Sequence, residues 1–539
     1  MSNKLETFPY ENPTVGAFIR RRAAEIGDQQ LIVLGSRSLT YAQAEERSTA
    51  LAHGLLDAGI GKGSHVGVLM PNGPDWVTVW LAAARIGAVL VPINTFYKPR
   101  ELAWVLHHAD VSTLLTVDRY LGHDYLERLE ESAPSLAECN GRDVSANELP
   151  CLKSVYVWGE ATRSWSRSAD PLFATATSAA VLEAAEAEVS PDDPMMIIYS
   201  SGSTADPKGA VHGQGSTLRH AWNLNTFRDL TQHDRIYTPM PFFWVGGFVF
   251  SLLAAMHAGA CLLTEESFEP GRTLDLLENE AATIVAGWPH YSKAMSEHES
   301  FPRRDLSRLR GGNLYDLLPE DVRPNDPELR ANSLGMTETC GPHTIGRMDV
   351  DLPESLRGSF GKSVPGLEHK IVDPESGETL AAGEFGEICV RGYSLMQGLY
   401  KVVRDEVFDG DGYYHTGDGG YFDADGHLYF KGRLGDVIKT GGANVSPLEI
   451  EQLMAAMDEI KQAYVIGLPD ADRGEIVAAA VVLNADAELS QEDLAGRLKK
   501  ELSSYKVPKR YFFRTSEELP FTDTGKIDKR KLVAALADA

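Results

Sequence analysis

A loop rich in small hydroxyl residues follows an apolar segment near the middle of the chain. Residues 195–199 (MMIIY) have the character of a buried strand and lead into SSGSTADPKG, residues 200–209. The backbone N–H groups and hydroxyls of such a loop, together with the Lys208 ammonium, are suited to holding phosphate oxygens. No Lys-Ser/Thr pair follows the glycines, which excludes a Walker A loop. Taken alone, the loop fits a phosphate site and a flexible surface turn about equally well.

Two later segments carry oxygen groups suited to a metal ion and a sugar. LGMTE (residues 334–338) contains Thr337 and Glu338, and a hydroxyl beside a carboxylate suits Mg²⁺, a hard ion that prefers oxygen ligands. YHTGD (residues 414–418) ends in Asp418, whose carboxylate can accept hydrogen bonds from both hydroxyls of a ribose. Taken singly, each segment is better explained as a surface turn or a helix cap.

Two segments near the carboxyl end place basic side chains beside glycines. Arg433 precedes a glycine-rich turn (Gly441, Gly442) that leads into a helical pattern, and Lys526 ends the polar loop TDTGK. A solvated charge is the simpler interpretation of each segment by itself. Function therefore has to be argued from the five segments together.

In this order and at these separations, the five segments resemble those of the AMP-forming acyl-CoA synthetases, a family of adenylate-forming enzymes. The resemblance extends from Tyr41 to Leu532 and includes PIN (residues 92–94), GEI (386–388), YKVP (505–508) and KRKL (529–532). It implies that a carboxylic acid attacks ATP to give an acyl-adenylate and pyrophosphate, and that the thiol of coenzyme A then displaces AMP. A carrier-protein thiol as the acceptor, and a binding homologue without catalysis, are the alternatives.

The resemblance also implies roles for individual residues. Thr337 is expected to contact the α-phosphate, Glu338 to bind Mg²⁺, and Lys526 to bridge the acid and the α-phosphate during adenylation. The implied nucleotide- and cofactor-binding positions are Ser200, Ser201, Gly202, Ser203, Thr204, Lys208, Gly312, Leu334, Gly335, Asp418, Arg433, Gly441 and Gly442. Within this set, Asp418 and Arg433 are expected at the ribose, and Gly441 and Gly442 along the pantetheine tunnel.

Four positions depart from the family pattern. Ala205 stands in place of a glycine in the phosphate loop, and Leu334 in place of the aromatic residue that packs on adenine. Gly435 stands in place of the charged residue at the hinge, and Trp244 in place of a histidine. We expect Trp244 to gate the passage between the acid pocket and the thiol tunnel, with an ordinary core tryptophan as the alternative.

The predicted acid pocket is mostly apolar and aromatic. Its expected lining residues are Phe243, Trp244, Val245, Gly246, Trp288, Gly335 and His343. None of them offers a Lys, Arg or Asp side chain to a polar tail, so we expect a hydrophobic acid. A medium- or long-chain fatty acid and an aryl or alicyclic acid both fit, and a role in fatty acid or other lipid metabolism follows. The bulk of the two tryptophans slightly favours a short or flat acyl group.

The elements that carry these residues predict an α/β fold. Helical patterns over residues 42–58, 74–86 and 99–108 alternate with apolar strands over 65–70, 89–93 and 112–117. Strands that are apolar on both faces and separated by helices are typical of parallel sheets covered on each side. We therefore expect a large, multi-layered N-terminal domain with doubly wound sheets.

A smaller α+β domain is expected after a compositional change near Gly432. Helical patterns cover residues 447–457 and 491–503, and strand patterns cover 463–467, 476–483 and 511–514. We place the domains at residues 1–434 and 435–539, with the smaller one rotating about a hinge at Gly435, where glycine permits backbone rotation.

Composition limits the partners and the compartment. The chain has 539 residues, and its formal net charge of −26 disfavours nucleic acid and anionic membranes as partners. Five widely spaced cysteines without a CxxC pair, and an amino terminus without an apolar core, favour a reducing cytoplasmic location. The uncharged run at residues 242–263 is expected as a buried helix rather than a membrane span. The expected partners are small molecules, and the oligomeric state, a homodimer included, is left open.

Overall fold

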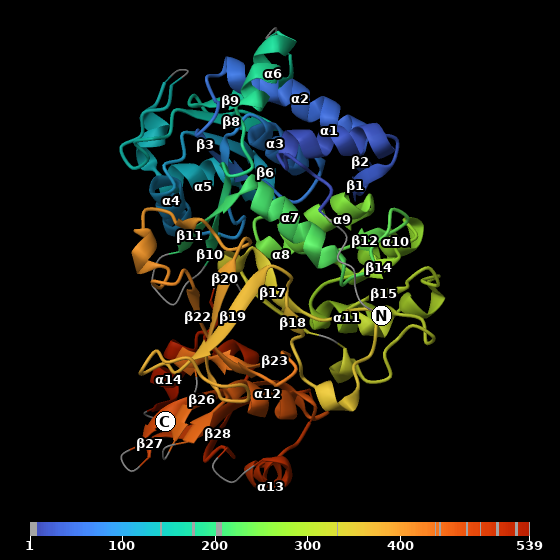
Figure 1. Ribbon diagram of the computed structural model, residues 1–539, viewed down its shortest axis with the longest axis vertical. Helices are drawn as coiled ribbons and strands as arrows, with labels where there is room; N and C mark the ends of the chain where they lie inside the picture. Colours follow the sequence, from blue (N-terminus) through green and yellow to red (C-terminus); the bar gives the residue numbers. More distant parts are fainter. Residues whose placement is uncertain are drawn as a thin grey trace. The chain divides into compact units, whose positions relative to one another are not determined.

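The computed structural model forms two compact units (Figure 1). The described residues are 8–140, 143–174, 178–200, 207–330, 332–436, 438–440, 443–470, 473–485, 487–502, 506–522 and 526–537, with the backbone alone at 289, 439, 443 and 444. The first unit comprises Met1–Glu368 and Arg391–Tyr414, and the second comprises His369–Val390 and His415–Ala539. The second unit thus begins upstream of the predicted boundary at residue 435. The division into two units does not show whether the smaller domain rotates about Gly435, and that rotation stays a prediction.

An eight-stranded sheet forms much of the first unit. Its order is β21 (Gly398–Leu399), β11 (Lys208–Gly213), β10 (Pro194–Ser200), β4 (Val89–Pro92), β3 (His65–Leu69), β5 (Thr113–Val117), β8 (Ser154–Trp158) and β9 (Ser166–Ser168). All neighbouring strands from β10 to β9 are parallel, whereas β11 is antiparallel to both its neighbours. The predicted strands at 65–70, 89–93, 112–117 and 195–199 are confirmed. Their side chains are buried on both faces, as expected of a covered parallel sheet.

A second sheet of the first unit has six strands. Its order is β15 (Gly311–Gly312), β14 (Ile284–Val285), β12 (Arg235–Tyr237), β13 (Cys261–Thr264), β1 (Gln30–Leu34) and β2 (Arg37–Thr40). Every pairing is parallel except that of β1 with β2. The carboxyl ends of these parallel strands meet at one edge, the usual location of ligand sites in such sheets. The expected α/β architecture with two doubly wound sheets is confirmed.

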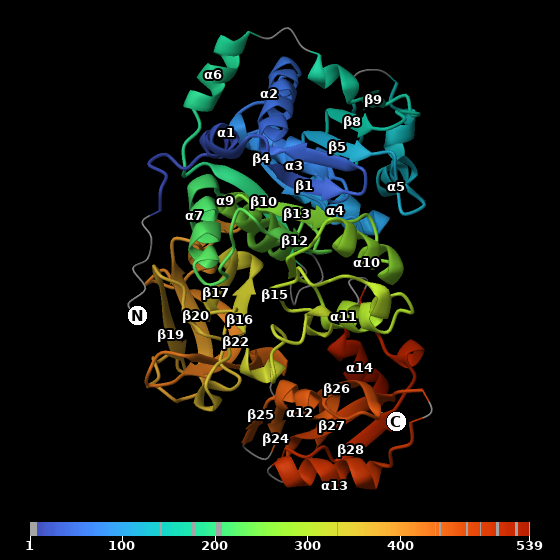
Figure 2. The same ribbon diagram turned by 90° about the vertical axis from the view of Figure 1, so that its right-hand side faces the viewer.

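Helix α3 (Pro74–Arg85) is enclosed within the first unit (Figure 2). It contacts β1, β2, β3 and β4 as well as α1 (Val15–Ile26) and α2 (Tyr41–Asp57), so it lies between strands of both sheets. All of its residues except Asp75 are buried, which fits its nearly continuous apolar sequence. Pro74 occupies the first turn, where a missing N–H is tolerated. The predicted helices at 74–86, 42–58 and 99–108 are confirmed, the last as α4 (Pro99–His108).

The uncharged run at residues 242–263 is a buried helix followed by a strand. Its helical part consists of α8 (Val245–Gly247), the π-helical turn η3 (Phe248–Leu253) and α9 (Ala254–Ala258), and it ends at Gly259 with φ of +77°. Phe248 packs edge-on against Trp80 at 5.0 Å between ring centroids. The prediction of a buried helix is thus confirmed for the helical part, while residues 261–263 belong to β13. Within the described ranges, no helix has the length and apolarity to cross a membrane.

The second unit contains an α+β module, as predicted. Its five-stranded sheet consists of β25 (Ala443–Val445), β24 (Ile438–Thr440), β27 (Gly474–Leu483), β26 (Ile460–Asp470) and β28 (Arg510–Phe513). The accompanying helices are α12 (Pro447–Ala455), α13 (Gln491–Glu501) and α14 (Lys529–Ala537). A further four-stranded sheet, which the sequence patterns did not predict, consists of β19 (Leu367–Val372), β20 (Gly386–Gly392), β22 (Tyr414–Phe422) and β23 (Leu428–Arg433).

Buried histidines give the first unit a pH-dependent stability. His257 is enclosed by the rings of Phe18, Trp222 and Tyr10, at 4.6, 5.8 and 5.9 Å between centroids. Burial lowers the pKa of His257 to about 3, because an apolar interior penalises the imidazolium cation. The same cause lowers the pKa of His220 to about 3 and that of His212 to about 4. These side chains are therefore neutral in the folded protein at neutral pH.

Replacing His257 by phenylalanine is expected to make the free energy of unfolding depend less steeply on pH below about pH 6.5. Below about pH 6.5 the unfolded chain binds a proton at this histidine that the folded protein does not, so stability falls as the pH falls. One such site contributes a slope of about 1 kcal/mol per pH unit. Urea unfolding of wild type and His257→Phe between about pH 7 and about pH 5 measures the difference. The exposed His233, replaced by glutamine, serves as the control, and an unchanged slope in His257→Phe would contradict the prediction.

Candidate active site

The predicted phosphate loop connects the antiparallel strands β10 and β11. Ser200 at the end of β10 pairs in register with Lys208 at the start of β11, and the Lys208 side chain is exposed. Both residues thus lie at the base of the loop, at the carboxyl end of a parallel strand. The buried Tyr199 hydroxyl lies 2.7 Å from His108 Nδ1 and fixes the end of β10. The remaining predicted residues of the loop lie outside the described residues: Ser201, Gly202, Ser203, Thr204 and Ala205.

A tight turn carries Thr337 and Glu338. The 3₁₀ turn η7 (Thr337–Thr339) joins β16 (Ser333–Met336) to β17 (Gly341–Ile345). Gly335 pairs with Pro342, and a Cβ atom there would lie 2.5 Å from the Gly341 backbone, so the close approach of these strands requires glycine. The Thr339 hydroxyl donates to the Gly341 carbonyl at 2.7 Å and closes the turn.

A buried histidine joins this turn to the phosphate hairpin. His212 on β11 is 1% exposed, and its Nε2 donates to the Thr337 carbonyl at 2.8 Å. The Met396 backbone N–H donates to the Glu338 carbonyl, also at 2.8 Å. Thr337 and Glu338 are therefore held against β11, the strand that begins at Lys208. Their approach to one nucleotide together with Ser200 and Lys208 stays a prediction. The sequence reasoning missed His212, although a histidine inside the otherwise apolar segment AVHG was an available signal.

The Glu338 carboxylate suits a divalent cation. Glu338 and Thr337 are both partly exposed, and they present a carboxylate and a hydroxyl on adjacent residues. Among the residues that the structure describes, no Lys or Arg side chain forms an ion pair with Glu338. A hard cation such as Mg²⁺ prefers oxygen donors of this kind. The donor set fits the predicted metal, and metal binding at Glu338 stays a prediction.

Leu334, the residue predicted to pack on adenine, is 9% exposed.

Three residues of the predicted acid pocket form an aromatic cluster. The ring centroids of Phe243 and Trp244 lie 5.1 Å apart, and Trp244 meets Trp288 at 6.4 Å and 89°. Phe243 and Trp244 follow β12, and Trp288 follows the neighbouring parallel strand β14. All three therefore lie at the carboxyl edge of the six-stranded sheet. Val245 and Gly246 continue from this cluster as the first residues of α8.

Two asparagine side chains fix the loops at this edge. Asn72, which follows β3 of the other sheet, donates to the Met240 carbonyl and accepts from the Phe242 N–H, both at 2.8 Å. Asn313 forms the same pair of bonds with Gly287, at 2.8 and 2.9 Å. The aromatic cluster is thus positioned by amides that the sequence reasoning did not identify. Asn72 lies shortly after the apolar strand β3, which was a weak signal, and the Gly311-Gly312 pair before Asn313 offered none.

For two other predicted residues, the structure explains the residue type by packing or backbone geometry. Their proposed contacts with a ligand stay predictions. Gly312 has φ of +118°, and a Cβ atom there would lie 1.9 Å from the Val285 carbonyl oxygen, so β15 requires glycine at this position. His343 on β17 is 0% exposed and lies near His220. Because the side chain is buried, the structure does not establish that it lines the acid pocket. Its role there stays a prediction.

In the second unit, the residues predicted at the ribose form an ion pair. Asp418 on β22 pairs in register with Arg433 on β23, and Arg433 Nε lies 2.9 Å from Asp418 Oδ1. Asp418 is 3% exposed, so the neighbouring guanidinium compensates a largely buried carboxylate. Arg433 also donates to the Thr416 carbonyl at 2.8 Å. The structure brings the predicted pair together, and their contact with a ribose stays a prediction.

Lys526 lies next to an antiparallel bridge between Phe521 and Ile527 in the second unit. The Thr522 N–H donates to the Lys526 carbonyl at 2.7 Å, and the Lys526 N–H donates to the Thr522 hydroxyl at 3.2 Å. Its side chain is exposed. Gly441 and Gly442 lie outside the described residues.

The predicted hinge residue has room for a side chain. Gly435 lies in the short 3₁₀ turn η10 (Leu434–Asp436), and a Cβ atom built on it meets nothing within 4 Å. Its φ is not in the left-handed region. The local structure therefore does not require glycine here.

Comparison with known proteins decides the family. The model described as AMP-binding enzyme matches residues 19–400, and the one described as AMP-binding enzyme C-terminal domain matches residues 449–526. This chain belongs to the AMP-binding enzyme family. The prediction of an adenylate-forming acyl-CoA synthetase is thereby confirmed at the level of the family, and with it ATP-dependent ligation of an acid to CoA.

Similar proteins extend over nearly the whole length of this AMP-binding enzyme. The acyl-CoA ligase sidI of Aspergillus fumigatus is 31% identical and covers 97% of this chain and 92% of its own. A propanoyl:CoA ligase of Rhodococcus jostii, whose acyl group carries a methyl-dioxo-octahydro-indenyl ring system, is 30% identical and covers 97% of this chain and 99% of its own. A crystal structure of the anthranilate CoA ligase AuaEII in complex with anthranoyl-AMP covers 97% of both chains, with 25% identity and a TM-score of 0.82.

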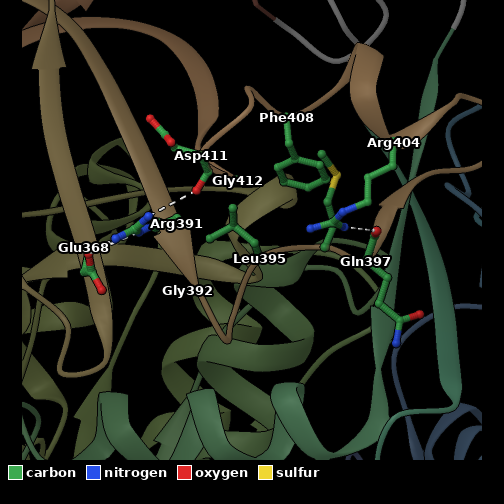
Figure 3. Close-up of a pocket in the computed structure, with 10 residues that line it drawn as sticks. Glu368, Arg391, Gly392, Leu395, Gln397, Arg404, Phe408, Asp411 and Gly412 are labelled. Atoms are coloured by element: carbon green, nitrogen blue, oxygen red, sulfur yellow. Dashed lines mark hydrogen bonds and ion pairs between the residues drawn. The ribbon is translucent and has the colours of Figure 1, made fainter. Parts of the chain in front are cut away.

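A pocket of about 400 Å³ lies in the first unit of the AMP-binding enzyme (Figure 3), and none of the predicted acid-pocket residues lines it. It is lined by Glu368, Arg391, Gly392, Leu395, Met396, Gln397, Arg404, Phe408, Asp411 and Gly412. Arg391 forms an ion pair with Glu368 at 2.6 Å and donates to the Asp411 carbonyl at 3.1 Å. Arg404 donates to the Gln397 carbonyl at 2.8 Å. Both guanidinium groups already bind protein oxygens, and we assign this pocket no ligand.

Replacing His212 is expected to slow adenylation. In His212→Leu the partly buried Thr337 carbonyl loses its donor, a loss of about 1–3 kcal/mol, which corresponds to a rate lower by about fivefold to 150-fold when it falls on the transition state. His212→Gln keeps an N–H donor and is expected to retain most of the activity. Both variants are compared with wild type by AMP release at saturating ATP, with urea unfolding to check the fold. Full activity in a folded His212→Leu variant would show that the bond does not position Thr337.

Proposed function

We propose that this enzyme adenylates a hydrophobic, ring-bearing carboxylic acid and transfers the acyl group to the thiol of CoA. The observation that carries the proposal is the aromatic cluster of Phe243, Trp244 and Trp288 at the carboxyl edge of the six-stranded sheet. None of the seven predicted lining residues carries a formal charge at neutral pH. Two perpendicular indoles leave flat surfaces suited to a ring. The names of two similar ligases also contain ring-bearing acyl groups.

The first half-reaction uses groups from both units. The substrate carboxylate attacks the α-phosphorus, the bond to the β-phosphate oxygen breaks, and pyrophosphate leaves. Ser200, Lys208 and the loop between them hold the departing phosphates, while Thr337 orients the α-phosphate. Lys526 places its ammonium between the carboxylate and the α-phosphate, where negative charge accumulates. Mg²⁺ held by Glu338 would supply charge neutralisation at the phosphates.

The second half-reaction requires Lys526 to make way for the thiol. The CoA sulfur attacks the acyl carbon, the bond to the AMP oxygen breaks, and AMP leaves with the negative charge. Asp418 and Arg433 hold the ribose through both steps. Rotation of the C-terminal domain about Gly435 brings the Gly441–Gly442 turn to the pantetheine.

The five free cysteines support a reducing, cytoplasmic location.

Acid selectivity is expected to depend on Trp244. In a panel of aryl, alicyclic and fatty acids, wild type is expected to give the highest kcat/KM with a ring-bearing acid. Trp244→Ala is expected to lower that value by about fivefold, because an aromatic contact contributes about 1 kcal/mol beyond its buried area. Trp244→His, which restores the residue common in the family, is the matched variant. AMP release is measured, and an unaltered ranking in Trp244→Ala would contradict a place for Trp244 in the pocket.

Lys526→Ala is expected to separate the two half-reactions. Pyrophosphate release from ATP and acid should fall by several orders of magnitude, because no other group replaces the ammonium at the α-phosphate. Thioester formation from a supplied acyl-adenylate should be nearly unchanged. The control Lys531→Ala removes an exposed lysine of α14. Equal loss in both half-reactions would refute this assignment of Lys526.

A further inference from the structure

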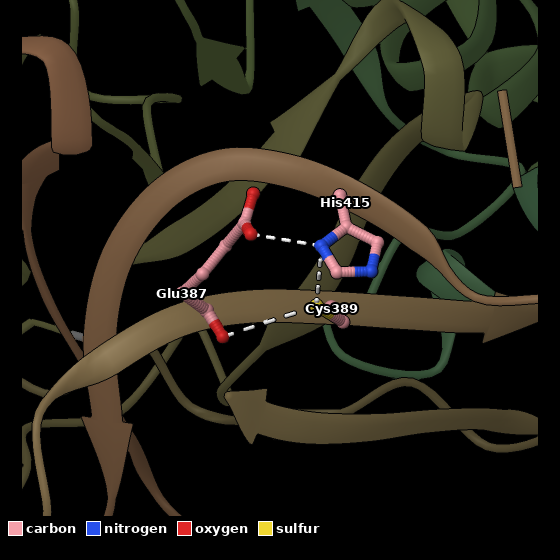
Figure 4. A group of neighbouring side chains, drawn as sticks. All are labelled: Glu387, Cys389 and His415. Carbon is pink, nitrogen blue, oxygen red and sulfur yellow. Dashed lines mark hydrogen bonds and ion pairs between the residues drawn. The ribbon is translucent and has the colours of Figure 1, made fainter. Parts of the chain in front are cut away.

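Three metal-binding side chains converge on neighbouring strands of the second unit (Figure 4). Glu387 and Cys389 lie on β20, and His415 lies on β22, the next strand in the sheet. Residues 387 and 389 are two apart on a strand, so their side chains share one face. A carboxylate oxygen, the thiol sulfur and an imidazole nitrogen all lie within 4.8 Å of one another. None of the three was among the residues predicted for the active site.

The imidazole Nδ1 of His415 faces both other groups. It lies 2.8 Å from Glu387 Oε2 and 3.5 Å from Cys389 Sγ. A ring nitrogen has one in-plane position, so Nδ1 either donates a proton to the carboxylate or accepts one from the thiol. It cannot do both at once. The thiol also lies 4.0 Å from the Glu387 backbone carbonyl, which can accept its proton instead. A cation between the three groups would accept a lone pair from each of them.

The spacing and the type of the ligands favour zinc. With Zn–S of about 2.3 Å and Zn–N of about 2.0 Å, a tetrahedral ion separates sulfur and nitrogen by about 3.5 Å. The observed separation of Nδ1 and Sγ is 3.5 Å. A thiolate and an imidazole select borderline-soft transition metals over Mg²⁺ or Ca²⁺. Three protein ligands leave the fourth position to water.

The burial of the cluster leaves one direction of entry. Cys389 is fully buried, whereas the side chains of Glu387 and His415 are 15% and 40% exposed. A hydrated ion can therefore reach the site from the His415 side.

We propose that Glu387, Cys389 and His415 form a binding site for Zn²⁺ or a similar divalent transition metal. On binding, the thiol releases its proton to solvent, and the ion replaces the bond between Glu387 and His415.

The site is linked to the predicted ribose-binding strand. Glu387 Oε1 accepts from the Gly417 N–H at 2.9 Å, and the Thr416 hydroxyl donates to the Ile388 carbonyl at 2.6 Å. Gly417 directly precedes Asp418. When the metal draws the Glu387 carboxylate toward itself, the bond to Gly417 weakens and Asp418 shifts. Metal binding is therefore expected to lower the affinity for AMP, an effect that rests on the proposed function, whereas the metal site itself does not.

Titration of the full-length protein with Co²⁺ tests the site independently of activity. The expected result is one equivalent of bound metal with a thiolate-to-cobalt charge-transfer band in the near ultraviolet, displaced by Zn²⁺. Cys389→Ser is expected to abolish the band, and His415→Gln to weaken metal binding at least tenfold. The control Cys139→Ser replaces a partly exposed thiol outside the cluster and should keep the band. Absence of the band in wild type, or its persistence in Cys389→Ser, would overturn the proposal.

Binding of AMP with and without Zn²⁺ tests the link to the ribose strand. Several-fold weaker binding is expected in wild type and no change in Cys389→Ser, with circular dichroism to verify that the variant is folded. If AMP binds wild type equally well while the cobalt band is present, the metal site stands and the link to Asp418 is wrong. If AMP does not bind at all while the band is present, the proposed function fails and the metal site is supported.

Discussion

The hydrogen bond from His212 to the Thr337 carbonyl connects the turn that carries Thr337 and Glu338 to the strand that begins at Lys208. Ser200 and Lys208 sit at the ends of one pair of strands, and Thr337 and Glu338 sit on a short turn of another sheet. The two segments must keep a fixed separation if they act on one nucleotide, as proposed. A buried donor on β11 supplies that constraint, and its neutral imidazole is a direct result of burial.

The acid pocket depends on a similar device at the edge of the second sheet. Parallel strands deliver their following loops to a common edge, but the loops themselves need fixing. Asn72 connects the loop after β3 to the loop after β12, and so joins the two sheets by a side chain. An amide can donate and accept at once, which makes it suited to bind a backbone N–H and a carbonyl in the same loop.

The sequence predicted the strands and helices of the core well, because strands buried on both faces have nearly continuous apolar runs. It did not predict the four-stranded sheet of β19, β20, β22 and β23, whose buried and exposed residues mix irregularly. His212 and Asn72 were missed for another reason. Each bonds a residue more than a hundred positions away, and no local pattern marks such a contact. The roles of Lys526, Asp418 and Glu338 rested on the family resemblance, since their own segments read as ordinary turns.

The open surroundings of Gly435 separate two requirements that usually act together on a hinge residue, namely packing in the folded protein and freedom of backbone rotation. Since a Cβ atom there meets nothing within 4 Å and the φ is not left-handed, packing does not require glycine at this position. The proposed rotation of the domain is then the demand that remains on this position. Under the proposed rotation about Gly435, a charged or chemically labelled residue at this position would alter how the enzyme cycles without disturbing the packing of the fold, which makes it a natural handle for observing or tuning turnover.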